Sequence, residues 1–122
     1  MSALSDYMEA ALINAMLRGT SFTAPAVNDL HLALFTASPT DAYVTANEVS
    51  AAWYSRKPTG TWTAPSNGVS QNSAEINFSA VTGTAITITH IGVYDAATAG
   101  NLLFWAPLST SKTLDVGDVL SV

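Results

Sequence analysis

The sequence predicts a mostly β domain, an antiparallel β-sandwich or barrel of about six or seven short strands preceded by one N-terminal α-helix. Three observations predict it. Apolar residues recur at helical spacing near the N-terminus, alternating apolar and polar residues mark later segments, and Pro, Gly, Asn and Asp separate those segments. We expect a single domain over 1–122, with the helix at 1–19 and a β part at 29–122. A long irregular loop region should occupy about 38–72.

The N-terminal segment is predicted to be a helix from about Ser5 to Arg18. Asp6 followed by Glu9 is typical of a helix start, where a cap side chain and an acid three residues on bind free backbone N–H groups. Arg18 in the last turn and Gly19 after it suit a helix end. An apolar stripe at three- and four-residue spacing is formed by Leu4, Met8, Ala11, Leu12, Ala15 and Met16, widened by Ile13 and Leu17.

The strand signals fall in two parts of the chain. The run 30–36 has the pattern of a central strand covered on both sides. Between 41 and 72 only short candidate strands, near 53–56 and 61–63, interrupt Pro- and Gly-rich loops that we expect to be the most exposed part. The second half predicts strands near 75–79, 86–89 and 91–94, a hairpin connection at 96–100, a strand from 101 that ends near Pro107, and a last strand at 119–122.

The composition indicates a surface that packs against other chains. Hydrophobic residues make up 48% and charged residues only 11%, against a usual charged share of about 25%. Thr, Ser and Ala replace the missing charge, and these short side chains permit close approach between subunits. The predicted N-terminal helix could likewise dock on a neighbouring surface or pack within an oligomer.

The same composition argues against several classes of function. The formal charge is −5 with four Lys or Arg, of which only Arg56 and Lys57 are adjacent, so we expect no direct nucleic-acid binding. No apolar run is long enough to span a bilayer, so we expect no membrane partner. No basic n-region precedes the N-terminal apolar residues, so we expect no signal peptide. Cysteine is absent, which removes disulfides and thiolate chemistry.

No residue pattern indicates an enzyme or a cofactor. His31 and His90 lie in strand patterns, where a histidine bonded to a backbone or hydroxyl group is commoner than a catalytic one, and no nucleophile elbow is present. Asp115 and Asp118 could share a calcium ion, but their spacing completes no known loop. We therefore predict no catalytic residue, no cofactor and no metal site.

The candidate interface residues are aromatic or lie at the end of the sequence. Trp53, Tyr54 and Trp62 fit a place in the core, a protein interface or a sugar-stacking surface, and Arg56 lies beside the first two. The last strand ends without a polar tail, so we expect it to pair with a neighbouring chain's sheet edge. It contributes the candidate residues Val119, Leu120 and Val122.

Several stretches taken together resemble a family of small structural proteins of tailed bacteriophages, often labelled as tail fibre proteins. The resemblance covers nearly the whole chain in a preserved order. It rests on Leu4-Ser5-Asp6-Tyr7, Ala11-Leu12-Ile13-Asn14, Leu32-Ala33-Leu34-Phe35-Thr36, Ser38-Pro39-Thr40-Asp41, Glu48-Val49-Ser50, Ile91-Gly92-Val93-Tyr94-Asp95, Gly100-Asn101-Leu102-Leu103-Phe104 and Lys112-Thr113.

The resemblance implies a non-enzymatic virion component that is assembled in the host cytoplasm. Its partners would be copies of itself, with a trimer expected by analogy with other phage surface proteins, and other virion proteins. Three roles follow, in order of preference: a capsid decoration or cement protein that braces neighbouring subunits, a tail-fibre, baseplate or tail-tip component, and a carbohydrate-binding module.

Overall fold

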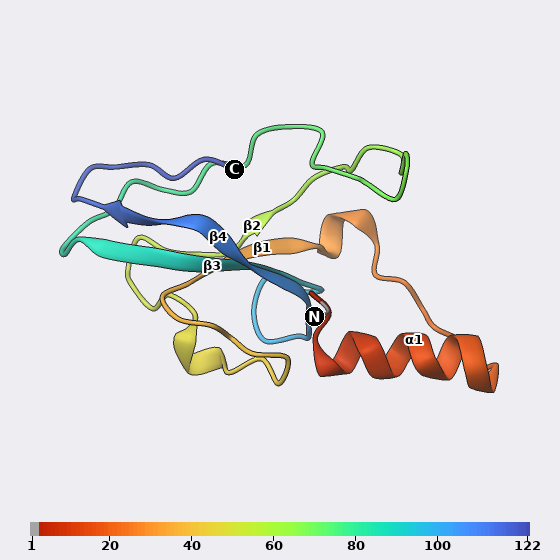
Figure 1. Ribbon diagram of the computed structural model, residues 1–122. Helices are drawn as coiled ribbons and strands as arrows, with labels where there is room; N and C mark the ends of the chain where they lie inside the picture. Colours follow the sequence, from red (N-terminus) through yellow and green to blue (C-terminus); the bar gives the residue numbers. More distant parts are fainter. Residues whose placement is uncertain (1–2) are drawn as a thin grey trace.

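The computed structural model, which describes residues 3–122, contains one long helix and a four-stranded antiparallel sheet in the order β2-β1-β3-β4 (Figure 1). The prediction of a mostly β fold with an N-terminal helix is confirmed. The prediction of six or seven strands is wrong, because the sheet has four. The elements are α1 (Asp6–Arg18), short 3-10 helices at Val27–Asp29 and Thr45–Asn47, β1 (His31–Phe35), β2 (Lys57–Pro58), β3 (Ile86–Tyr94) and β4 (Leu102–Leu114).

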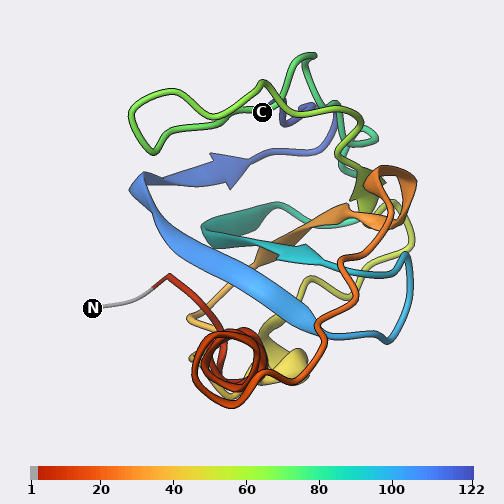
Figure 2. The ribbon, with the colours of Figure 1, turned by 90° about the vertical axis from the view of Figure 1, so that its right-hand side faces the viewer.

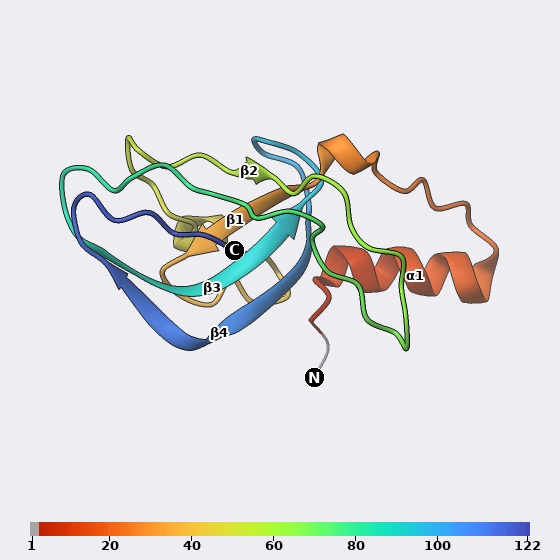
Figure 3. The ribbon, with the colours of Figure 1, turned by 90° about the horizontal axis from the view of Figure 1, so that it is seen from above.

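Helix α1 has the predicted extent but a different N-cap. Ser5, not Asp6, is the cap residue, and its hydroxyl accepts a hydrogen bond from the Met8 N–H at 3.2 Å. The same hydroxyl donates to the Leu102 carbonyl, which fixes the start of α1 to β4. Gly19 ends the helix in the left-handed conformation, with φ at 65°. From that fixed start α1 extends away from the sheet (Figures 1 and 3).

Strand β1 lies inside the sheet and is buried on both faces, as its continuous apolar pattern predicts. Side chains alternate along it, so Leu32 and Leu34 face one side while Ala33 and Phe35 face the other. The second face forms a small cluster of Ala33, Phe35, Tyr94 and Leu102. The first face belongs to the main core, which contains Leu32, Leu34, Val49, Trp53, Ile76, Phe78, Val81, Ile88, Val93 and Leu114.

Strand β4 continues to Leu114, beyond the end predicted near Pro107. β4 is an edge strand of the sheet, and a proline is tolerated there because its missing N–H need not bond a neighbouring strand. β3 likewise merges two predicted strands into one, with a register shift between Ile88 and His90. The predicted connection at 96–100 is confirmed, since β3 ends at Tyr94 and β4 begins at Leu102.

Two further predicted strands pair with each other outside the sheet. Ile76 and Val122 exchange backbone hydrogen bonds of 2.8 and 2.9 Å, and the Phe78 N–H donates to the Leu120 carbonyl at 3.0 Å. These contacts produce a single bridge, between Asn77 and Ser121, and no extended ladder. The paired segments cover one face of the sheet, while α1 lies on the other side (Figure 2).

The irregular region predicted at 38–72 is present, with two different halves. Residues 60–71 are exposed throughout, and backbone bonds between 61–63 and 71–73 close them into a loop that we call the 60–73 hairpin. The earlier half is packed against the sheet, and Trp53 in it is buried in the main core. The prediction of high exposure is therefore confirmed for the second half, while the first half mixes exposed residues with buried ones such as Val49 and Trp53.

A buried ion pair holds that first half in place. The Arg56 guanidinium donates to both carboxylate oxygens of Glu48 at 2.7 and 2.8 Å, and to the carbonyls of Ala96 and Ala99. Its Cζ lies 3.5 Å from the centre of the Tyr94 ring. The pair thereby joins the irregular region to β3 and to the β3–β4 connection.

Tyr54 completes this group and titrates abnormally because of it. Its hydroxyl donates to Glu48 Oε1 at 2.7 Å and accepts from the Leu34 N–H of β1 at 3.2 Å. Burial raises the pKa of Tyr54 above its ordinary value, and the bond to Glu48 raises it further. Burial also raises the pKa of Tyr94. For Arg56, the bond and charge of Glu48 outweigh desolvation and raise the pKa.

Replacing Gly92 by a residue with a side chain is predicted to destabilise the fold, because no space is left for a Cβ atom. A Cβ at this position of β3 would lie 2.7 Å from Leu102 Cδ1, 3.0 Å from Phe35 Cε2 and 3.1 Å from the Phe104 carbonyl oxygen. We expect Gly92→Ala to lower the unfolding free energy by about 1–3 kcal/mol, measured by urea denaturation. Ser109→Thr also adds one methyl group to the sheet, at an exposed site, and should change stability by less than about 0.5 kcal/mol. Equal effects of the two changes would contradict this account.

The raised pKa of Tyr54 predicts a loss of stability in alkali. The folded chain keeps a proton that the unfolded chain releases near pH 10, so the contribution of Tyr54 to the unfolding free energy should be constant below about pH 9 and fall above pH 10. Tyr54→Phe should make that fall shallower and, by removing two hydrogen bonds, lower stability at pH 7 by about 1–2 kcal/mol. Urea denaturation from pH 7 to 11 measures both effects. Tyr7→Phe, at an exposed tyrosine of α1, is the control and should retain the wild-type profile.

Candidate interaction groove

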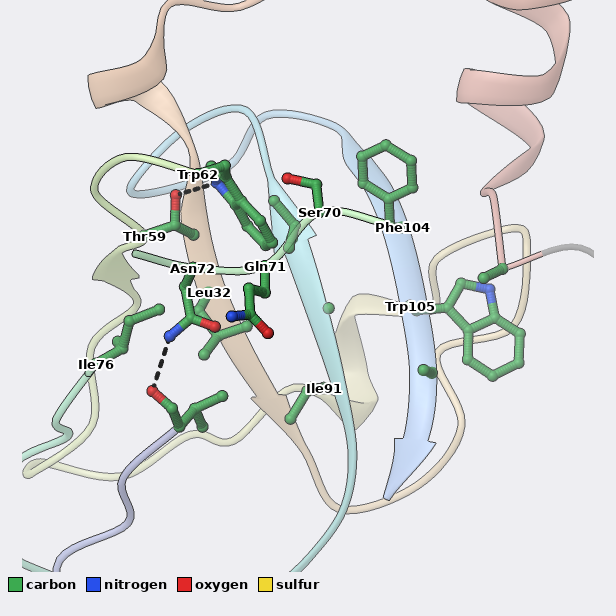
Figure 4. Close-up of a pocket in the computed structure, with 15 residues that line it drawn as sticks. Leu32, Thr59, Trp62, Ser70, Gln71, Asn72, Ile76, Ile91, Phe104 and Trp105 are labelled. Atoms are coloured by element: carbon green, nitrogen blue, oxygen red, sulfur yellow. Dashed lines mark hydrogen bonds between the residues drawn. The ribbon is translucent and has the colours of Figure 1, made fainter. Parts of the chain in front are cut away.

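An open apolar groove lies between the 60–73 hairpin and one face of the sheet (Figure 4). It consists of two adjoining hollows of about 320 and 500 Å³, which share Trp62, Ser70, Val93 and Phe104. Further apolar side chains on its walls come from Leu30, Leu32, Ile76, Ile91, Ala106 and Val122. We call this feature the groove.

The sheet register explains the sheet wall of the groove. Leu32 pairs with Val93, which pairs with Phe104, so these three side chains lie in a row on one face. Leu34, Ile91 and Ala106 form the next row. Trp105 is offset by one residue, and its indole points to the opposite side of β4 (Figure 4). Residues 3–5 pair with the outer edge of β4 at this point, yet the Phe104 side chain remains 42% exposed.

Side-chain hydrogen bonds fix the hairpin wall of the groove. Trp62 Nε1 donates to Thr59 Oγ1 at 3.0 Å, which orients an indole that is 37% exposed. Asn72 Nδ2 donates to the Val122 carbonyl at 3.1 Å and so ties the hairpin to the C-terminal segment (Figure 4). The groove is therefore built from six separate parts of the sequence, namely 3, 30–32, 59–76, 91–93, 104–106 and 122.

Over residues 3–122, the walls of the groove carry no charged side chain. Within the described residues, no Asp, Glu, Lys or Arg lines either hollow. Thr59, Ser70, Gln71 and Asn72 supply its polar side chains. Such a surface favours burial of apolar groups and offers neither an acid-base pair nor a set of ion ligands.

Of the candidate interface residues, the groove brings together Trp62 and Val122. Val119 is exposed at 52% outside it, and Leu120 packs against the main core. The C-terminal segment pairs with 76–78 of its own chain, and pairing with a neighbouring chain stays a prediction.

Of the other three candidates, Trp53 lies in the core, while Tyr54 and Arg56 are partly buried. Trp53 is 8% exposed and meets the Tyr54 ring edge-on, while Arg56 is held by Glu48. For Trp53 the structure thus shows core packing, one of the three roles that the sequence left open.

Sequence reasoning missed Val93 and Phe104 as groove residues. Both lie in strand patterns that predict core residues, and Val93 is indeed buried in the main core. Phe104 is 42% exposed beside it, and that exposure follows from its place on the outermost strand, which no local pattern reveals.

A second exposed apolar surface lies on the C-terminal half of α1. Ile13, Met16 and Leu17 share one face and are 56%, 80% and 80% exposed. The sequence placed all three in the apolar stripe of the helix. The structure buries Met8, near the fixed start of α1, and leaves the later residues uncovered. We call Ile13, Met16 and Leu17 the helix patch.

The two histidines have ordinary local partners. His31 Nδ1 lies 2.8 Å from the Asp29 carbonyl oxygen, and His90 Nδ1 lies 2.7 Å from Thr89 Oγ1.

Asp118 accepts a hydrogen bond from the Asp115 N–H, so these two acids stabilise a turn. Over residues 3–122, no cluster of three or more His, Cys, Asp or Glu has the arrangement of a metal site. No helix in that range has both the length and the apolar character to cross a bilayer.

Comparison with known families places the chain among bacteriophage proteins. No curated protein matches it. Residues 3–122 match the model of a family described as podophage GP4 fiber I protein gp80. This match covers nearly the whole chain, agrees with the resemblance seen in the sequence, and indicates a structural component of the virion. The chain belongs to the podophage GP4 fiber I protein family.

Proposed function

We propose that this protein is a non-enzymatic structural subunit of a phage tail fibre, which works by packing against other protein chains. The family match over residues 3–122 is the observation that carries the proposal, because the description of the family names a fibre protein. The groove and the helix patch support it, since both are apolar, uncharged surfaces of the kind that protein partners cover.

The fibre role replaces the capsid role preferred from the sequence. That preference rested on a compact chain with few charges and no fibre-shaft repeat, and these features suit a small fibre subunit equally well. The family description favours the tail-fibre alternative and offers nothing for capsid decoration. Assembly in the host cytoplasm is an expectation that follows from a virion role.

The proposed location predicts where an antibody binds on intact particles. Gold-labelled antibody against the exposed 60–71 segment should mark the tail region of purified virions and leave the capsid surface unlabelled. Quantitative mass spectrometry of the same particles should find a few to a few dozen copies. Particles from a phage that lacks the gene provide the control and should bind no gold.

Capsid decoration predicts the opposite result. Gold spread over the capsid together with hundreds of copies per particle would contradict the fibre proposal, while a complete absence of the protein from purified particles would contradict any virion role.

A further inference from the structure

We propose that the groove binds α1 of a second copy of this chain, through the helix patch. The inference deepens the proposed function by naming the partner of the groove, but it concerns a contact between two chains and does not require a particular location on the particle. It rests on the two apolar surfaces that the fold leaves uncovered.

The groove is suited to apolar side chains. Val93 and Phe104 from the sheet and Trp62 from the hairpin face it, and no charged residue of the described chain lines it. Burial of apolar area is favourable in such a place, whereas a charged or strongly polar ligand would lose its hydration without finding an ionic partner. A sugar stacked on Trp62 would find few polar side chains to bind its hydroxyls, since the polar residues that line the groove within the described chain are only Thr59, Ser70, Gln71 and Asn72.

The helix patch has the matching properties. Its residues occur at positions i, i+3 and i+4, which is the spacing of side chains that enter a groove together. The stretch 10–17 contains no charged residue, so a whole two-turn segment can be buried without desolvating an ion. In the proposed contact between two copies, neither surface has a charged side chain among the described residues, so no charge repulsion opposes their association.

The helix of the same chain cannot fill its own groove. Hydrogen bonds from the Ser5 N–H to Leu103 and from the Asp6 N–H to Asp41 hold the first turn of α1, and its far half extends beyond the sheet (Figures 1 and 3). The helix patch lies on that far half, where Met16 and Leu17 are each 80% exposed. A second chain is thus needed to bring patch and groove together.

The area involved predicts a closed assembly. Each surface is small, because the helix patch consists of three exposed side chains and the large exposed side chains of the groove are Trp62, Phe104 and Val122. One such contact falls short of the roughly 800 Å² per partner found in stable complexes. Each copy should therefore place its α1 in the groove of one neighbour and bind the α1 of a neighbour in its own groove. This happens reciprocally in a dimer or around a ring such as a trimer.

A complementation experiment with two variants tests the contact. Met16→Lys/Leu17→Lys alters the helix patch and keeps the groove, while Phe104→Glu alters the groove and keeps the helix patch. By analytical ultracentrifugation of the full chain, wild type should form a dimer or a small ring, and each variant alone should associate roughly thirtyfold or more weakly. An equimolar mixture should associate more tightly than either variant alone and more weakly than wild type, because one intact helix patch and one intact groove remain.

Crosslinking supplies an independent measurement, since the natural sequence contains no cysteine. Met16→Cys and Ser70→Cys place single thiols on the helix patch and on the groove wall. Under mild oxidation a mixture of the two variants should give mainly the mixed Cys–Cys dimer, and either variant alone should give little. Dominant Met16→Cys homodimers would indicate helix–helix pairing and overturn the proposal.

Two controls keep the test decisive. Val116→Glu introduces an acid at an apolar residue that is 59% exposed and lies outside both surfaces, so it should associate like wild type. Circular dichroism must show that each variant is folded. If Phe104→Glu is not, Ser70→Glu places the charge on the exposed hairpin wall instead.

Three results would overturn the proposal. The first is a monomeric wild type, which would leave the groove to another virion protein or a glycan. The second is unchanged association of the folded groove variant. The third is a mixture that associates no more tightly than either variant alone. The antibody labelling can fail while the complementation succeeds, so location and contact are tested separately.

Discussion

The ion pair between Glu48 and Arg56 is the contact on which the irregular half of the fold depends. Both side chains are almost fully buried, and Arg56 also bonds two carbonyls of the β3–β4 connection and lies over the Tyr94 ring. Loss of either partner would leave a buried charge uncompensated, which costs far more than the pair itself contributes. The segment between β1 and β2 has little regular structure, so this pair, with Tyr54, sets its path along the sheet. That path places Trp53 in the core and positions Thr59, which orients Trp62 at the groove.

The few charges of this chain are arranged so that an ion pair holds the interior while two apolar surfaces stay free of charged side chains. One of its two arginines, Arg56, has a buried side chain that bonds backbone carbonyls. Among the described residues, no charged side chain lines the groove or belongs to the helix patch. A solitary soluble domain normally spreads Lys and Glu over such surfaces. Their absence from two separate surfaces fits a subunit whose apolar areas are covered after assembly, which is the role that the fibre family suggests.

The parts predicted best are those in which local pattern and tertiary environment agree. β1 is buried on both faces, as its unbroken apolar run requires, and α1 ends at Gly19, as a left-handed glycine requires. Where the environment decides, the predictions fail. Asp6 has the chemistry of a cap, but Ser5 takes that position because its hydroxyl also reaches Leu102 of β4. Pro107 has the chemistry of a strand end, but at the edge of a sheet a missing N–H leaves the strand intact.

By itself the sequence determined the mostly β class, the N-terminal helix, the central strand and the family, because periodicity, turn residues and ordered local matches are properties of short segments. It also pointed to Trp62 and Val122 as surface residues. Only the tertiary structure decided that Trp53 and Arg56 lie inside, that β4 is an edge strand, and that the helix patch has no cover in its own chain. The physical reason is that exposure depends on which distant segments pack together. An apolar residue at helical or strand spacing looks the same whether its own core or a neighbouring chain buries it.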